Sequence, residues 1–283
     1  MGQNAVTSMQ FLSFSRMQTN DRNGLLTSRA NALVKQTVAV RKSARERRES
    51  GLFFLEGARL CADAVSTGTV VSVCLYTDEA AQKYADRLRT VLSAAEKAAR
   101  ITPELAEYLS ETKSPQGVFC LCRMRERTDR IDSAGKYLAL SDVQNPDNLG
   151  AISRTAEALG LSGLIVEGGC DPYNPKAQRA AMGALLRIPI IETDDLCALL
   201  EDCRGRGMRT FASTPDADAL PVTDVSFSGG TVCVVGNEGA GLREEILRSC
   251  TRVTIPMRGR AESFNASAAA TILLWEMTRE DAR

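Results

Sequence analysis

The segment at residues 231–277 constrains the fold more than any other part of the chain. Residues 232–235 form an apolar run, which indicates a buried parallel strand. The glycine-rich residues 236–241 interrupt this run before a helical pattern begins at Leu242. The segment therefore opens with a strand, a flexible loop and a helix, which is the repeating unit of an open α/β sheet.

A second unit of the same kind follows directly. Residues 252–257 predict another strand, residues 258–260 break it, and a helix begins near residues 263–265. The apolar positions of that helix are Ala269, Ile272, Leu273 and Met277. We expect the two strands to be adjacent, with both loops at the carboxyl end of one sheet, where open α/β sheets bind ligands. This edge is the predicted ligand site.

Together with an earlier segment, these loops resemble the signature motifs of the SpoU (TrmH-like) RNA 2′-O-ribose methyltransferases of the SPOUT superfamily. The matching residues are Asn148-Leu149-Gly150 with Arg154, then Gly236-Asn237-Glu238-Gly239 with Gly241, and last Ile255-Pro256-Met257 with Gly259 and Ser263-Phe264-Asn265 with Ser267. Many nucleotide-binding folds share one glycine-rich loop, but three motifs in this order are a specific signal. The resemblance implies a deep trefoil knot, S-adenosyl-L-methionine bound within it, and a homodimer formed through the carboxyl-terminal domain.

The resemblance also implies a set of cofactor-binding residues. These are Gly236, Asn237, Gly241, Ile255, Met257 and Phe264. Backbone groups of Gly236, Ile255 and Phe264 are expected to surround the cofactor, with two side chains, Asn237 and Met257, lining the pocket. Phe264 stands where the family usually has leucine, which affects the fit of the pocket rather than the chemistry.

The predicted catalytic residues are Arg154, Asn148, Glu238, Ser263 and Asn265. Arg154 is expected to orient the ribose hydroxyl and a phosphate, because a guanidinium is a poor base unless a phosphate relays the proton. Glu238 could be a general base or a carboxylate partner of Arg154, and we favour the partner because such a pair fixes geometry. The alternative for Asn148, Ser263 and Asn265 is capping of helix amino termini, which is compatible with a place in the site.

The order of the predicted elements divides the chain into two domains. Residues 1–25 are polar and aperiodic, and we expect a disordered leader. Strands and helices alternate over residues 26–122, with a long helix at residues 80–98, which predicts a smaller α/β domain. The resemblance makes this domain the RNA substrate-binding domain. Charged residues 123–133 form the predicted linker, and residues 134–283 the methyltransferase domain, a doubly wound sheet of five or six parallel strands.

Composition excludes several classes of site. The chain has no histidine, which rules out Ser-His-Asp and Cys-His nucleophilic sites and histidine-rich zinc sites. Its nine cysteines contain no Cys-x-x-Cys pair, so we expect no metal and interpret most of them as buried apolar residues in a reducing cytoplasm. No stretch is long and apolar enough to cross a membrane.

Charge gives one candidate for an RNA contact. The 35 basic residues balance the 35 acidic ones, so the chain has no global positive field. A local basic run does occur, at Arg41, Lys42, Arg45, Arg47 and Arg48. An RNA-facing patch and a solvated helix end are equally good interpretations of this run.

The resemblance implies a cytoplasmic, S-adenosylmethionine-dependent 2′-O-methyltransferase acting on structured RNA. Ribosomal RNA is favoured over transfer RNA because the chain has a separate amino-terminal domain. One alternative is a noncatalytic RNA-binding protein that keeps the knotted fold. Another nucleotide-cofactor enzyme with a Rossmann sheet is disfavoured, because the expected Gly-x-Gly-x-x-Gly is missing at the first strand of its sheet.

Overall fold

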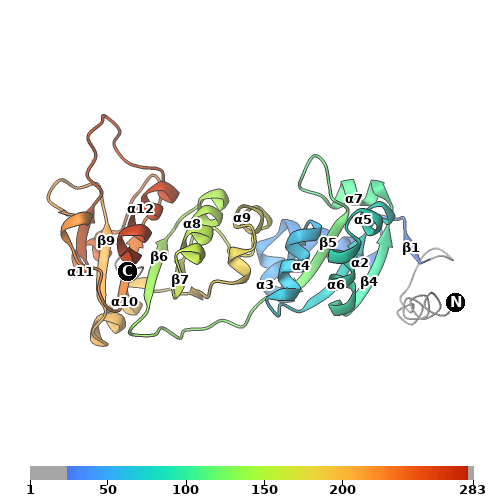
Figure 1. The fold of residues 1–283 in the computed structure, drawn as a ribbon, viewed down its shortest axis with the longest axis horizontal. Helices are drawn as coiled ribbons and strands as arrows, with labels where there is room; N and C mark the ends of the chain where they lie inside the picture. Colours follow the sequence, from blue (N-terminus) through green and yellow to red (C-terminus); the bar gives the residue numbers. More distant parts are fainter. Residues whose placement is uncertain (1–23, 280–283) are drawn as a thin grey trace. The chain divides into compact units, whose positions relative to one another are not determined.

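The computed structural model describes residues 24–279, which form two compact units that divide between Arg125 and Glu126 (Figure 1). This point falls inside the predicted linker. The predicted leader lies outside the described residues except for its last two positions. Within residues 24–279, no helix combines the length and apolar character needed to cross a membrane.

The amino-terminal unit is a five-stranded sheet covered by helices. Its elements are β1 (Leu25–Leu26), α2 (Ala32–Lys42), α3 (Ala44–Ser50), β2 (Leu52–Glu56), α4 (Ala58–Ser66), β3 (Val71–Tyr76), α5 (Asp78–Lys83), α6 (Ala85–Ala94), β4 (Lys97–Ile101), α7 (Pro103–Leu109) and β5 (Val118–Arg123). The strand order is β1-β4-β3-β5-β2. β5 runs antiparallel to both of its neighbours, and the other pairs are parallel. The predicted α/β domain is thus present.

The prediction of a single long helix at residues 80–98 is wrong. The helical segment breaks at Tyr84, and β4 begins at Lys97. The sequence of β4, Lys-Ala-Ala-Arg-Ile, has high helix propensity, but pairing with β3 and β1 inserts it into the sheet, where Ile101 is buried in the core. Tertiary context overrides local propensity at such positions.

The carboxyl-terminal unit contains a seven-stranded sheet. Its elements are β6 (Lys136–Ser141), α8 (Pro146–Ala158), β7 (Gly163–Glu167), α9 (Pro175–Ala180), η1 (Ala184–Leu186), β8 (Ile190–Glu192), α10 (Leu196–Gly205), β9 (Arg209–Ser213), β10 (Leu220–Pro221), η2 (Val222–Asp224), β11 (Thr231–Val235), α11 (Glu244–Ser249), β12 (Thr251–Thr254) and α12 (Ala266–Thr278). All strand pairs are parallel, in the order β10-β12-β9-β11-β6-β7-β8. The prediction of a parallel α/β sheet is confirmed, with β10 added.

The strands that precede the two glycine loops are not adjacent. β9 pairs with both β11 and β12 and separates them, so the predicted adjacency is wrong. Consecutive strands are neighbours in only about two-thirds of cases, and the sequence pattern alone does not set their order. Both loops still leave the carboxyl edge of the sheet, because all the strands are parallel.

Helices cover both faces of this sheet (Figure 1). One buried cluster joins the sheet to α8, α9, η1 and α12, and a second joins it to α10 and α11. This is the doubly wound arrangement that the alternation of strands and helices predicts. The knot that the resemblance implies stays a prediction.

Candidate functional site

Three residues from the three motifs meet at the carboxyl edge of the larger sheet. The Asn148 amide, 6% exposed, donates Nδ2 to Glu238 Oε1 at 2.9 Å. Asn265 donates Nδ2 to Asn148 Oδ1 at 3.2 Å. These two hydrogen bonds tie together the start of α8, the loop after β11 and the start of α12. Segments that lie far apart in the sequence therefore form one site.

The Glu238 carboxylate is held by donors from the loop that follows β6. Besides Asn148, the backbone amides of Gln144 and Asn145 donate to it at 3.2 and 3.3 Å. Burial alone would raise the pKa of Glu238, but the hydrogen bonds from Asn148 and the backbone amides outweigh it and lower the pKa. Glu238 is thus ionised at neutral pH and acts as a hydrogen-bond acceptor, which makes it a poor general base.

The expected pairing of Glu238 with Arg154 is not found within residues 24–279. α8 begins at Pro146, so Asn148 lies in its first turn and faces Glu238. Arg154 lies six residues further on, about 9 Å along the helix at 1.5 Å per residue. The distance along α8 explains why the amide and not the guanidinium reaches the carboxylate.

Arg154 is exposed on α8. It lines a groove of about 400 Å³ together with Thr155, Ala158, Leu159, Thr271 and Trp275. Within the described residues its guanidinium has no hydrogen bond or ion pair, so its donors face solvent. The side chain is available to a molecule that approaches this face.

The helix caps differ in part from those expected. Asn145, and not Asn148, caps α8 through a bond from Asp147 N at 2.8 Å, with Pro146 in the first turn. The predicted cap of α12 by Asn265 is confirmed, because its Oδ1 accepts from Ser267 N at 3.0 Å. Ser263 is exposed in the preceding loop and does not cap this helix. Asn265 thus fixes the helix start with one amide atom and Asn148 with the other.

The glycine loop after β11 closes on itself. Asn237 and Gly241 exchange both backbone hydrogen bonds, at 3.1 and 3.0 Å. Asn237 Oδ1 also accepts from Gly239 N and Ala240 N, and its Nδ2 donates to Asp142 O at 2.9 Å. A Cβ atom on Gly236 would meet Gly241 O at 2.4 Å, so the turn has no room for any other residue there. Asn237 shapes the loop, and the loop presents bare backbone.

The other predicted cofactor residues lie in the connection from β12 to α12. Ile255 is half-buried and packs against the core of the unit, and Met257 is half-buried. Phe264 keeps 41% of its surface exposed. This connection therefore offers apolar side chains on the same edge of the sheet as the glycine loop.

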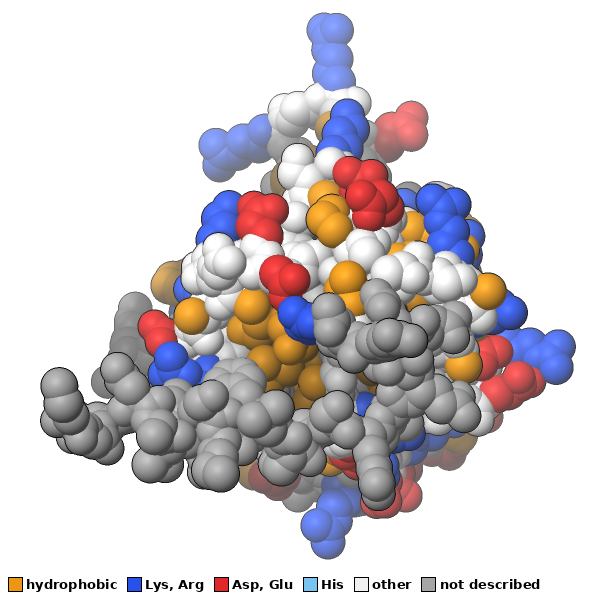
Figure 2. Space-filling model, turned by 90° about the vertical axis from the view of Figure 1, so that its right-hand side faces the viewer, with side chains coloured by type: hydrophobic (Ala, Val, Ile, Leu, Met, Phe, Trp, Pro, Cys, Tyr) orange, Lys and Arg blue, Asp and Glu red, His pale blue; other side chains and the backbone are white. Residues whose placement is uncertain are grey.

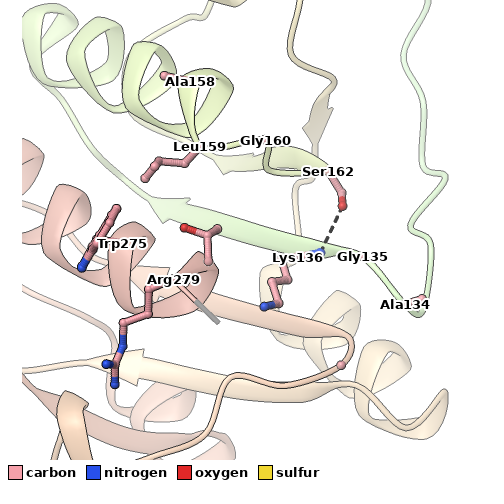
Figure 3. A pocket seen from close by; sticks show the side chains of 11 residues that line it. Ala134, Gly135, Lys136, Ala158, Leu159, Gly160, Ser162, Trp275 and Arg279 are labelled. Carbon is pink, nitrogen blue, oxygen red and sulfur yellow. Dashed lines mark hydrogen bonds between the residues drawn. The ribbon is translucent and has the colours of Figure 1, made fainter. Parts of the chain in front are cut away.

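A second cavity, of about 580 Å³, lies at the opposite edge of the sheet, where β6 begins (Figure 3). It is lined by Trp275 from α12, by Arg279 directly after that helix, and by Leu159 directly after α8. Lys136 is buried there and donates Nζ to Met277 O at 2.6 Å, which satisfies the carboxyl end of α12. This cavity is separate from the edge that holds the three motifs.

Two features near the site are not apparent from the motifs. Gly150 sits where α8 and α9 touch, since a Cβ there would meet Ala180 Cβ at 2.3 Å. Glu167, the last residue of β7, forms an ion pair with Arg243. The position of Glu167, a charged residue directly after an apolar strand, could have indicated its role from the sequence. The contact of Gly150 with α9 could not, because nothing in the residues around Gly150 indicates it.

Two members of the basic run are buried and donate to backbone carbonyls, and a third, Arg45, forms an exposed ion pair with Glu49. Arg41 is 8% exposed and donates to Leu109 O and Ser110 O at the end of α7, at 2.6 and 2.8 Å. Arg47 is 3% exposed and donates to Val40 O and Arg41 O at the end of α2. Lys42, Arg45 and Arg48 are exposed. An RNA contact by this run therefore rests on the last three.

Comparison with known proteins identifies the class. The SpoU rRNA Methylase family profile matches residues 135–275, and an MRM3-like substrate binding domain matches residues 31–120. A 23S rRNA (uridine(2479)-2'-O)-methyltransferase from Streptomyces viridochromogenes is 33% identical over 266 residues, which cover 90% of this chain and 92% of that one. The 23S rRNA (guanosine(2553)-2'-O)-methyltransferase RlmP of Bacillus subtilis is 28% identical over 82% of this chain and 91% of its own.

Solved structures agree with this result. The SpoU methyltransferase AviRb from Streptomyces viridochromogenes, in complex with AdoMet, has a TM-score of 0.81 at 29% identity, over 89% of this chain and 98% of that one. An AdoMet-bound rRNA methyltransferase from Sinorhizobium meliloti has a TM-score of 0.79 at 28% identity, over 90% and 97%. The protein belongs to the SpoU rRNA methylase family, as the three motifs predict.

Proposed function

We propose that this protein transfers a methyl group from S-adenosyl-L-methionine to a ribose 2′-hydroxyl of ribosomal RNA. The observation that carries the proposal is the hydrogen-bonded chain of Asn265, Asn148 and Glu238, which assembles all three motifs at one sheet edge. The relatives named above act on 23S rRNA, which favours ribosomal over transfer RNA. Such a substrate would be met in the cytoplasm.

The residues at this edge fit the methyl donor. Gly236 presents backbone without a side chain, and Ile255, Met257 and Phe264 add apolar surface for an adenosyl group. In the proposed complex, backbone groups of the two loops hold the donor, while Asn237 keeps the glycine loop closed. The bound cofactor supplies an activated methyl group carried by a sulfonium.

Arg154 is the residue proposed to act on the RNA. Its planar guanidinium offers several donors and no acceptor, so it orients a phosphate and the hydroxyl electrostatically and does not take the proton itself. Its exposed position on α8 is compatible with this role. Ser263, exposed in the loop before α12, is proposed to lie near the same RNA.

The groove beside Arg154 is proposed to be the contact between two copies of the chain. It lies between α8 and α12, and Trp275, at 54% exposure, is its largest apolar side chain. An exposed tryptophan between two helices is typical of an interface residue. In this arrangement Arg154 lies at the edge of the interface, close to RNA bound by either copy.

The charge of the two units supports RNA binding by the amino-terminal one. Residues 24–125 contain 16 Lys and Arg against 11 Asp and Glu, a net charge of +5, whereas residues 126–279 contain 16 against 21, a net charge of −5. An asymmetry of this kind favours a polyanionic partner for the basic unit. Figure 2 shows basic and acidic side chains interspersed on the face it displays, without one continuous basic patch.

The exposed part of the basic run gives a prediction. Replacing Lys42, Arg45 and Arg48 together with alanine is expected to make the slope of log affinity against log salt shallower by roughly two to three units, at about 0.7 to 0.9 per lost phosphate contact. Filter binding to ribosomal RNA fragments at several salt concentrations measures this slope. The matched control replaces Lys83, Arg87 and Arg89 on α5 and α6, with the same change in net charge. Equal slopes for the two variants would show that the run has no specific contact.

The proposed function itself is tested by mapping ribose methylation across total RNA from cells with and without the gene. Loss of one 2′-O-methyl mark in ribosomal RNA is the expected result. Loss of a mark in transfer RNA would show that transfer RNA, and not ribosomal RNA, is the substrate. An unchanged map would favour a noncatalytic RNA-binding protein.

A further inference from the structure

The carboxylate of Glu167 joins four elements behind the glycine loop. It accepts from Arg243 Nη2 at 2.7 Å to Oε1 and 2.9 Å to Oε2. It also accepts from Ser141 Oγ and from Leu196 N, both at 2.9 Å. Glu167 therefore connects the ends of β6 and β7 to the starts of α10 and α11. The Glu167 side chain is only 12% exposed, so its carboxylate is held in one position by the surrounding residues.

Arg243 is separated from the glycine loop by one residue, Leu242, and directly precedes α11. At its front the loop is held to the β6–α8 connection by Asn237, which donates to Asp142 O, and by the contacts of Glu238. At its rear, Arg243 ties it to Glu167. The exposed Gly239 and Gly241 between these points would otherwise leave the backbone many conformations.

We propose that Arg243 and Glu167 form a positioning pair, which fixes the rear of the loop at residues 236–242 in the conformation that binds the methyl donor. This inference rests on the proposed function. The Arg243 side chain is 52% exposed, so the ion pair contributes little to global stability. Its effect falls on the fraction of molecules whose loop is competent to bind, and the apparent Kd equals the intrinsic Kd divided by that fraction.

The test is Arg243→Gln in the full chain. If the competent fraction falls from near one to about one tenth, the Kd for S-adenosylhomocysteine measured by calorimetry rises about tenfold, and the KM for S-adenosylmethionine rises in parallel. The kcat should stay within about twofold, because the pair touches no reacting atom. In the ligand-free protein, amide hydrogen exchange of residues 238–242 should accelerate, since their backbone opens more often.

Two further variants separate positioning from general damage to α11. Arg248→Gln removes the other ion pair of α11, with Glu244 at 3.0 Å, and should leave the Kd and the exchange rates unchanged. Arg243→Lys should restore part of the affinity, because a lysine can still bring one cation to Glu167. Glu167→Gln combined with Arg243→Gln should weaken binding by less than the product of the single effects, as expected for residues that act together.

A wild-type Kd in Arg243→Gln would overturn the positioning role. So would a fall in kcat and melting temperature that accompanies the loss of affinity, because a structural residue gives that pattern. A wild-type protein that does not bind S-adenosylhomocysteine would instead refute the proposed function on which the inference rests.

Discussion

Arg154→Ala is expected to lower methyl transfer by a factor on the order of 10² to 10³ while the protein stays folded and keeps its affinity for the methyl donor. The guanidinium is exposed on α8, so its removal leaves no buried donor or acceptor unpaired. The chain of Asn265, Asn148 and Glu238 does not include it, so the loops around the donor should keep their positions. The loss should therefore appear in kcat.

Single-turnover methylation of ribosomal RNA, together with calorimetry of S-adenosylhomocysteine binding, measures both quantities. Arg154→Lys should recover little activity, because lysine offers a point charge where arginine offers a planar set of donors for a phosphate and a hydroxyl. Arg187→Ala is the matched control, since it removes an arginine paired with Glu157 in the same unit. Near-normal methylation by Arg154→Ala would show that the hydroxyl is oriented by another group.

Gly150→Ala is expected to destabilise the protein by about 1 to 3 kcal/mol, the usual cost of adding a methyl group to a packed interior. A Cβ at this position would meet Ala180 Cβ at 2.3 Å, Ala181 N at 2.8 Å and Ala177 O at 2.9 Å. Two of these three atoms belong to backbone, so α9 must move away from α8. Because α8 also presents Asn148 to Glu238, cofactor binding should weaken as well.

Denaturant unfolding of the carboxyl-terminal unit measures the first effect. Gly205→Ala is the control, because Gly205 is also helical, at the end of α10, and has nothing within 4 Å of its Cβ position. That variant should be neutral or slightly more stable, since alanine favours helix over glycine. Equal stability of the two variants would show that α8 and α9 adjust without cost.

The sequence predicts the larger sheet well because its strands are short apolar runs punctuated by glycine. Residues 232–235 show this pattern, and β11 forms there. The prediction fails where local propensity and environment disagree, as at β4, whose helix-favouring residues Lys-Ala-Ala-Arg form a strand because β3 and β1 flank them. The order of the strands could not be predicted from the pattern either, since β9 lies between β11 and β12 although it precedes both in the sequence.

The candidate site likewise has features that the sequence predicts and features that it does not. The convergence of Asn148, Glu238 and Asn265 could be predicted, because parallel strands bring their loops to one edge. The side chain that pairs with Glu238 could not be predicted, because the start of α8 decides whether Asn148 or Arg154 reaches this carboxylate. The inward direction of Arg41 and Arg47 was likewise hidden, since a run of basic residues does not show which carbonyl groups lie beside it.

The hydrogen bonds that assemble the site join residues 90 and 117 positions apart in the sequence. β6 must also pair with β11, where Lys136 aligns with the distant Thr231. Contacts of such long range form slowly and late, because a large loop has to close before they return any free energy. A chain still emerging from a ribosome therefore has no complete donor site until α12 has been made. The ability to bind S-adenosylmethionine would therefore appear only when folding is complete. The cofactor would then stabilise only the fully folded protein.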